Sequence, residues 1–144
     1  MKAVAIKRFV VDASMALALY FADEASRESA AVLDILENGA TAVAPAFWLL
    51  EVANALLMAE RRGRLSLAQS SVILQDLVDL QVVLAPDQIH HAWGQTLSLA
   101  RREELTEYDA AYLELALRES LPLATFDRKL RTAARRAGIT LVVG

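Results

Sequence analysis

Short runs of hydrophobic residues alternate with longer amphipathic segments along the chain, and each kind of segment predicts a different element. Five short, largely β-branched runs predict strands, at residues 8–12, 41–44, 81–85, 121–125 and 139–143. Longer segments with apolar residues three and four apart predict helices, at residues 14–21, 26–37, 47–62, 66–80, 87–103, 106–119 and 127–138. Residues suited to cap helix N-termini open four of these segments, namely Ser14, Ser66, Asp87 and Thr106. Strands alternating with helices predict a parallel sheet covered on both faces, in one α/β domain.

The composition restricts the class of protein. The chain has 144 residues, of which 56% are hydrophobic and 23% charged, so it can bury a core, is not intrinsically disordered, and fits one domain over residues 1–144. The absence of cysteine excludes a disulfide scaffold, a thiolate zinc site and a cysteine nucleophile. The longest apolar stretches each contain an acid and fall short of the ~20 uncharged residues of a membrane span. We therefore expect a soluble, cytoplasmic protein without a membrane partner.

Charge is distributed unevenly between the body of the chain and its C-terminal end. Residues 127–144 contain five basic residues and one acid, a net charge of +4, and because the whole chain is −3, residues 1–126 carry −7. The acidic total argues against a general nucleic-acid binder, whereas the basic end is suited to contact phosphate groups locally. The alternative interpretation of this segment is a solvated helix face. Its basic side chains are Arg128, Lys129, Arg131, Arg135 and Arg136.

Four carboxylates lie in apolar sequence surroundings, unlike most acids of this chain. They are Asp12, Glu51, Asp109 and Asp127. Asp12 ends the apolar run FVVD, and Asp127 comes shortly after the predicted strand LPLAT. Because ligands of open α/β sheets bind beyond the carboxyl ends of the strands, both acids are placed for a site. Burying a carboxylate is costly, so each must be compensated by a basic partner, hydrogen bonds or a metal.

The other two acids lie on predicted helices. Asp109 follows the N-cap Thr106, where the positive end of a helix favours negative charge. Asn54 comes three residues after Glu51 and shares its helix face, so we expect Asn54 to hold that carboxylate in place. Each of the four acids also has a purely structural interpretation, three as helix caps and Glu51 as the partner of an arginine.

Four carboxylates gathered at one edge of a sheet would repel one another. A divalent cation removes that repulsion, and oxygen ligands favour Mg²⁺ or Mn²⁺ over zinc. Such an ion lowers the pKa of a bound water and stabilises the charge that develops on a phosphate. The constellation therefore predicts phosphoryl chemistry.

Four motifs, in order, resemble those of PIN-domain ribonucleases, and among them the VapC-type toxins of bacterial toxin–antitoxin pairs. The motifs are VVDASMALA at 10–18, LLEVANAL at 49–56, LTEYDAAYLELA at 105–116 and LPLATFDRKLRTAA at 121–134. Each contains one of the four acids, and the third is the most specific. The first also contains Ser14, and the fourth contains Thr125. The resemblance covers nearly the whole chain, and no acidic position departs from it.

This resemblance implies a Mg²⁺- or Mn²⁺-dependent endoribonuclease with an acidic catalytic pocket. Asp12 and Asp109 would be the principal metal ligands, and Glu51 and Asp127 would complete the pocket, directly or through water. Ser14 and Thr125 would orient these carboxylates or waters. The basic helix would hold the RNA backbone through Arg128, Lys129, Arg131 and Arg135, of which Arg131 and Arg135 share one helix face.

The family further implies a fold and partners. The fold is a twisted parallel sheet of four to five strands flanked by about seven helices. The partners are RNA, a second copy of the chain in a homodimer, and a cognate VapB-type antitoxin. Two alternatives within this fold stay open, a non-catalytic interaction module and a housekeeping nuclease without an antitoxin. A haloacid-dehalogenase-like phosphatase is disfavoured because it needs a second Asp where Ser14 stands.

Overall fold

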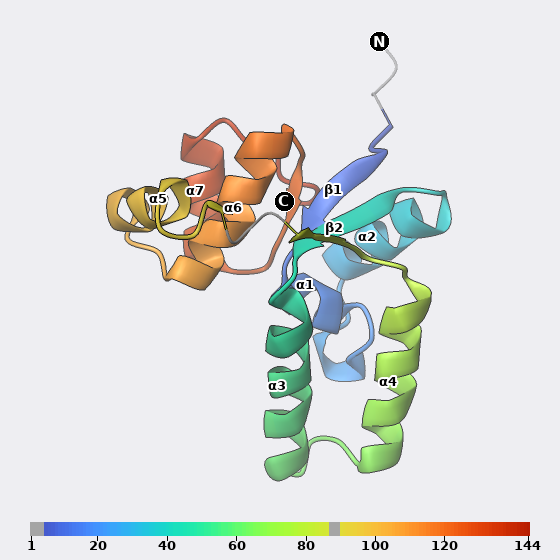
Figure 1. Cartoon of the computed structure of the whole chain (residues 1–144). Coiled ribbons are helices and arrows are strands. Elements are labelled where there is room, and N and C mark those ends of the chain that lie inside the picture. The colour runs from blue at the N-terminus through green and yellow to red at the C-terminus, as the bar shows by residue number, and fades with distance from the viewer. Residues whose placement is uncertain (1–4, 87–89) are drawn as a thin grey trace.

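A four-stranded parallel sheet forms the centre of the computed structural model, which describes residues 5–86 and 90–144 (Figure 1). The strands are β1 (Arg8–Val11), β2 (Thr41–Pro45), β3 (Val83–Ala85) and β4 (Leu123–Ala124). They lie in the order β3-β2-β1-β4, and every neighbouring pair is parallel. The chain therefore passes from β1 outward to β3 and returns to β4 on the other side of β1. This change of direction beside β1 is where a ligand site is expected in such a sheet.

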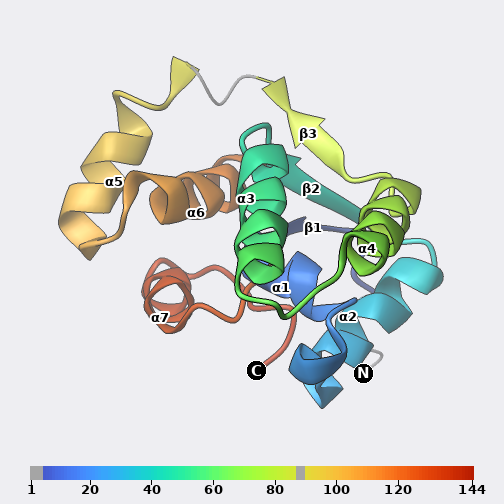
Figure 2. The same ribbon diagram turned by 90° about the horizontal axis from the view of Figure 1, so that it is seen from below.

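Seven α-helices surround the sheet in the described part of the chain, which confirms the predicted α/β class. They are α1 (Ala13–Ala18), α2 (Arg27–Glu37), α3 (Trp48–Arg61), α4 (Leu67–Asp79), α5 (Gln95–Glu103), α6 (Glu107–Glu119) and α7 (Arg128–Arg136), with a short 3₁₀ helix, η1 (Ala22–Glu24). α5, α6 and α7 gather on one side, and α2 and α4 lie on the other (Figure 2). None of the helices within the described residues is long and apolar enough to cross a membrane.

The core is built around β1 and α6. Phe9, Val10 and Val11 of β1 are almost completely inaccessible to solvent, as the central strand of a parallel sheet requires. Val10 and Val11 pair in register with Leu123 and Ala124 of β4. Residues 110–116 of α6 are all buried, and this helix contacts both β1 and β2. The carboxyl ends of β1 and β4, and the N-terminus of α6, are thereby fixed in one rigid framework.

Three helix or strand starts differ from the predictions, two of them for a local reason. The helix predicted from Ser14 begins at Ala13, because the Asp12 carboxylate, rather than Ser14, accepts the hydrogen bond that caps it. The strand predicted from residue 81 begins at Val83, because Gln81 has a positive φ of 53°, which a strand cannot accommodate. The helix predicted over 87–103 begins at Gln95, and its predicted cap, Asp87, lies outside the described residues.

The predicted fifth strand, 139–143, forms only an isolated bridge between Leu141 and Leu123. Two backbone hydrogen bonds support the bridge: the Leu123 amide donates to the Thr140 carbonyl, and the Val142 amide donates to the Leu123 carbonyl. β4 itself is only two residues long. β4 is therefore too short to pair with residues 139–143 along their whole length, and no fifth strand forms there.

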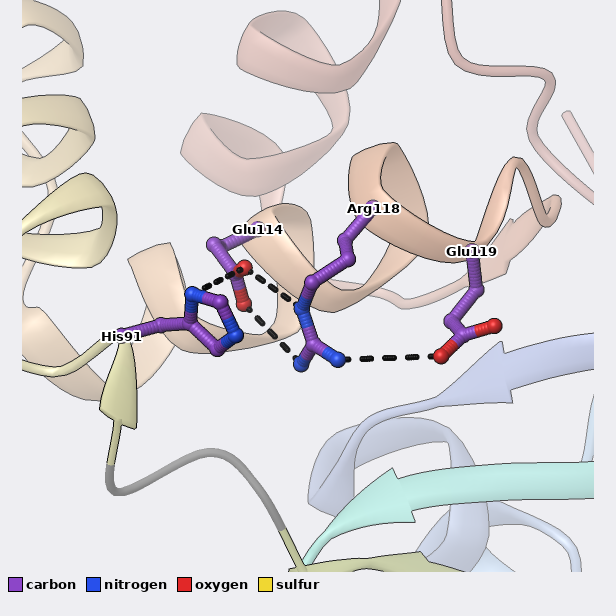
Figure 3. A network of polar contacts seen from close by, with 4 residues as sticks. All are labelled: His91, Glu114, Arg118 and Glu119. Atoms are coloured by element: carbon purple, nitrogen blue, oxygen red, sulfur yellow. Dashed lines mark hydrogen bonds and ion pairs between the residues drawn. The ribbon is translucent and has the colours of Figure 1, made fainter.

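A buried acid that the sequence did not single out shows how this fold compensates a carboxylate. Glu114 of α6 is only 5% exposed. Its Oε1 accepts a hydrogen bond from Arg118 Nε at 2.8 Å, and His91 Nδ1 lies 3.7 Å from the same oxygen (Figure 3). Arg118 also approaches Glu119 at 3.6 Å. The network neutralises Glu114 within the protein and joins the turn before α5 to α6.

Candidate active site

Asp12 stands at the carboxyl end of β1 and is only 4% exposed. Its Oδ1 accepts hydrogen bonds from Ser14 Oγ at 2.8 Å and from the Met15 amide at 2.9 Å. Its Oδ2 accepts a short hydrogen bond from the Thr125 hydroxyl. The carboxylate is therefore held in one orientation by donors from α1 and from the loop that follows β4.

No basic side chain of the described residues forms an ion pair with Asp12, in contrast to the pairing of Glu114 with Arg118. The pKa of Asp12 is raised from 3.8 to about 6, because burial, with a smaller contribution from the negative charge of Asp109, outweighs the lowering effect of the three hydrogen bonds. The site thus holds a carboxylate that is oriented but whose charge is not compensated. A cation from outside the chain would supply that compensation.

The loop after β4 is joined to the start of α1 by a chain of hydrogen bonds. The Asp127 amide donates to Thr125 Oγ1 at 2.9 Å, and the Phe126 amide donates to Ser14 Oγ at 3.1 Å. Asp127 in turn caps α7, because its Oδ1 accepts from the Leu130 amide at 2.8 Å. Ser14 and Thr125 both donate to Asp12, and Asp127 has the capping role that the sequence left as an alternative.

Asp109 links the other acids electrostatically. It lies half-buried in the first turn of α6, where its amide donates to the N-cap Thr106 Oγ1 at 3.1 Å. Burial raises the pKa of its carboxyl, and the charge of Asp127 raises it further. The charge of Asp109 contributes to the raised pKa values of both Asp12 and Glu51. The four predicted acids thus belong to one set of interacting charges.

Glu51 of α3 is held by a residue that the sequence analysis missed. Its Oε1 accepts a hydrogen bond of 2.5 Å from the hydroxyl of Tyr112, which is buried in α6. The structure does not bring Asn54 to Glu51: Asn54 is exposed, and no hydrogen bond joins the two among the described residues. Burial raises the pKa of Glu51, and also that of Tyr112, where the bond to Glu51 adds to the increase. Tyr112 could have been noticed because it lies three residues after Asp109, on the same face of α6.

The donor chemistry of this site fits a hard divalent cation. All four acids offer oxygen ligands, the type that Mg²⁺ and Mn²⁺ prefer. As positioned, no three Asp, Glu, His or Cys side chains of the described residues are close enough to hold an ion together. A three-residue cage is not needed, because Mg²⁺ commonly uses one or two carboxylates and completes its coordination with water and substrate phosphate. One or two carboxylates of this site would therefore be enough to hold such an ion.

The basic side chains of α7 divide into three kinds. Arg131 donates to the carbonyls of Thr125 and Val143, each at 3.0 Å, and Arg135 donates to the Gly144 carbonyl at 2.7 Å. The Arg131 guanidinium is fixed by two neutral backbone oxygens, so its charge is not cancelled, whereas Arg135 contacts the last residue of the sequence. Arg128 and Lys129 are exposed and form no ion pair within the described residues. By contrast, Arg136 is paired with Glu103 at 3.1 Å.

Two hollows flank α7. One, of about 440 Å³, is lined by Glu28, Phe126, Arg128, Arg131, Thr132 and Arg135. The other, of about 360 Å³, is lined mainly by charged residues of α5 and α7, and Arg128 borders both. A larger hollow of about 620 Å³ lies elsewhere, at Tyr20 and Arg64, and contains none of the four acids. The two hollows beside α7 are likewise not lined by any of the four acids. The contact between the acids and α7 is made by Asp127, which caps that helix.

Comparison with known proteins agrees with this geometry. Residues 9–136 match the PIN domain. The chain is 32% identical over 123 residues to Ribonuclease VapC3 of Pyrobaculum aerophilum, a match that covers 85% of this chain and 92% of that protein. The crystal structure of PAE2754 from Pyrobaculum aerophilum superimposes with a TM-score of 0.67 at 27% identity, covering 92% of this chain and 87% of that one. The chain therefore belongs to the PIN-domain family, among its VapC-type ribonucleases.

Proposed function

We propose that this protein is an endoribonuclease that hydrolyses phosphodiester bonds of RNA with the help of Mg²⁺ or Mn²⁺. The observation that carries the proposal is Asp12, a buried carboxylate fixed by three hydrogen bonds and left without a basic partner among the described residues. A carboxylate fixed in this way costs the fold stability unless a cation binds to it. The match to Ribonuclease VapC3 supports RNA as the substrate.

Each residue of the site has a role in this proposal. Asp12 and Asp109 hold the ion, and Glu51 and Asp127 complete the acidic pocket, directly or through water. When bound, Mg²⁺ or Mn²⁺ would supply a lowered pKa for a water and positive charge beside the phosphate. Ser14 and Thr125 keep Asp12 in its orientation. Tyr112 donates a hydrogen bond that keeps Glu51 turned toward the pocket.

The RNA backbone is held by α7 in this proposal. Arg128 and Lys129 offer exposed charges, and Arg131 and Arg135 offer charges already fixed in position by backbone carbonyls. Phosphate contacts of this kind position a strand without selecting its sequence. They also keep an acidic pocket from repelling a polyanion.

We further propose that the protein is the toxin of a type II toxin–antitoxin pair, present in the cytoplasm as a homodimer and inhibited by a VapB-type antitoxin. The support is the name and the extent of the VapC3 match. A nuclease without an antitoxin and a non-catalytic module are the alternatives. Expression of the chain alone, beside expression of an Asp12→Asn variant, separates them: a toxin arrests growth only in its unaltered form.

The cleavage reaction is tested with a circular single-stranded RNA, which an exonuclease cannot attack. Purified protein is expected to linearise it in Mg²⁺ or Mn²⁺ and to stop in EDTA. Asp12→Asn is expected to abolish cleavage, whereas Asp34→Asn, at an exposed position on α2, leaves it unchanged. Cleavage that persists in EDTA, or in purified Asp12→Asn protein, would contradict the proposed site.

A further inference from the structure

An exposed aromatic ring borders the acidic site. Tyr108 lies in the first turn of α6, next to Asp109 in the chain, and 59% of its surface is exposed. No hydrogen bond of its hydroxyl occurs within the described residues, so no internal polar contact accounts for a tyrosine at this position. A large ring placed in solvent beside a catalytic carboxylate is available to a ligand.

The ring is also held in place. Phe47, at the start of α3, packs edge-on against Tyr108 with ring centroids 5.4 Å apart and an interplanar angle of 72°. Phe47 packs in the same manner against Tyr112, at 5.4 Å and 75°. Tyr112 is the buried residue that donates to Glu51. The three rings therefore form one aromatic cluster that connects the exposed ring to the framework of the site, so its orientation costs little entropy on binding.

Nucleic acid bases stack on aromatic side chains of this kind. Such stacking tolerates any sequence, because every base presents a π-face. We propose that Tyr108 stacks on a base of single-stranded RNA next to the phosphate that enters the acidic pocket. This inference rests on the proposed ribonuclease function and adds a base-contacting residue to the phosphate contacts of α7. Tyr108 acts on the position of the strand and takes no part in the hydrolytic chemistry.

The test compares two oligomers of equal length, a single-stranded RNA and the same ribose-phosphate chain without bases. Equilibrium binding to both is measured at low salt in the Asp12→Asn background, so that the RNA stays intact. Tyr108→Ala is expected to weaken binding of the base-bearing RNA by roughly 5- to 150-fold and to leave binding of the abasic chain unchanged. Tyr108→Phe keeps the stacking face and should bind both oligomers like the parent protein.

Leu117→Ala is the matched control. Leu117 lies on the same helix, eight residues after Asp109, and is 38% exposed. Its substitution should alter binding of neither oligomer. An equal loss for both oligomers in Tyr108→Ala would show a structural role and overturn the inference, as would no loss at all. Failure of the parent protein to bind RNA is a separate result, which would overturn the proposed function together with this inference.

Discussion

Replacing Asp12 by Asn measures how much the uncompensated carboxylate at the end of β1 lowers the free energy of unfolding. The carboxyl group has a pKa of about 6 in the folded chain against 3.8 in the unfolded one. The folded state therefore binds more protons between these values, and the free energy of unfolding falls as the pH rises from about 4 to about 6. Each pKa unit corresponds to about 1.4 kcal/mol, so the ionised group costs about 3 kcal/mol at neutral pH.

Asparagine removes the charge and keeps most of the geometry. Its side-chain oxygen can still accept from Ser14 and the Met15 amide, so the N-cap of α1 is retained. Its amide nitrogen faces the Thr125 hydroxyl, which must turn, at a cost of about 1 kcal/mol. Without metal at pH 7.5, we therefore expect Asp12→Asn to be about 2 kcal/mol more stable than the unaltered protein. For a chain of this size the melting temperature should rise by about 6 °C.

Thermal unfolding followed by circular dichroism in EDTA at pH 4 and at pH 7.5 checks this expectation. The higher melting temperature of Asp12→Asn should be seen at pH 7.5 and be absent at pH 4, where Asp12 of the unaltered protein carries a proton in the folded state. Asp34→Asn should shift neither transition, because Asp34 is exposed. A gain that is the same at both pH values, or a loss at pH 7.5, would refute the conclusion that the charge of Asp12 is uncompensated.

Further predictions concern the metal, Glu51 and the RNA backbone. Mg²⁺ or Mn²⁺ at a hundredfold excess over its dissociation constant should stabilise the unaltered protein by about 2.7 kcal/mol, and Asp109→Asn should lose most of that gain in the same melting assay. Tyr112→Phe removes the hydrogen bond that holds Glu51, so it should lower the cleavage rate and lower the free energy of unfolding by about 1 kcal/mol. An unchanged cleavage rate would show that Glu51 takes no part in the reaction. Replacing both Arg128 and Lys129 by Ala should make the log–log salt slope of single-stranded RNA binding shallower by about 1.4, or 0.7 per contact, with the cleavage sites unchanged on sequencing gels.

The acids of the site were predictable from the chain because each leaves a local signature. Asp12 interrupts an apolar run, and Asp109 follows a capping threonine. The fold then brings them near each other, because α6, which carries Asp109 in its first turn, packs against β1, which Asp12 follows. Seven helices and a parallel sheet likewise follow from hydrophobic periodicity. These predictions use only neighbours within a few positions along the chain.

The contacts between distant segments were not predictable in this way. Asn54 is the nearest polar neighbour of Glu51 along its helix, yet Tyr112 holds the carboxylate from 61 positions away. Sequence spacing gives the face of a helix but not which other helix lies against it. The same holds for Arg131: its spacing places it on one helix face with Arg135, but does not show that its guanidinium donates to the carbonyls of Thr125 and Val143. In both places the tertiary packing of α6 or α7 decided the partner.

Two buried carboxylates in this fold have opposite environments, and the difference indicates which of them is functional. Glu114 and Asp12 are almost equally inaccessible. Glu114 is paired with Arg118, one turn away on the same helix, so its charge is neutralised by the chain itself. Within residues 5–86 and 90–144, Asp12 has hydrogen bonds but no ion pair, and a second carboxylate, Asp109, is near enough to raise its pKa. Burial alone therefore does not identify a site; the stronger indication is a buried charge that the protein orients with three donors and leaves for an external cation to neutralise.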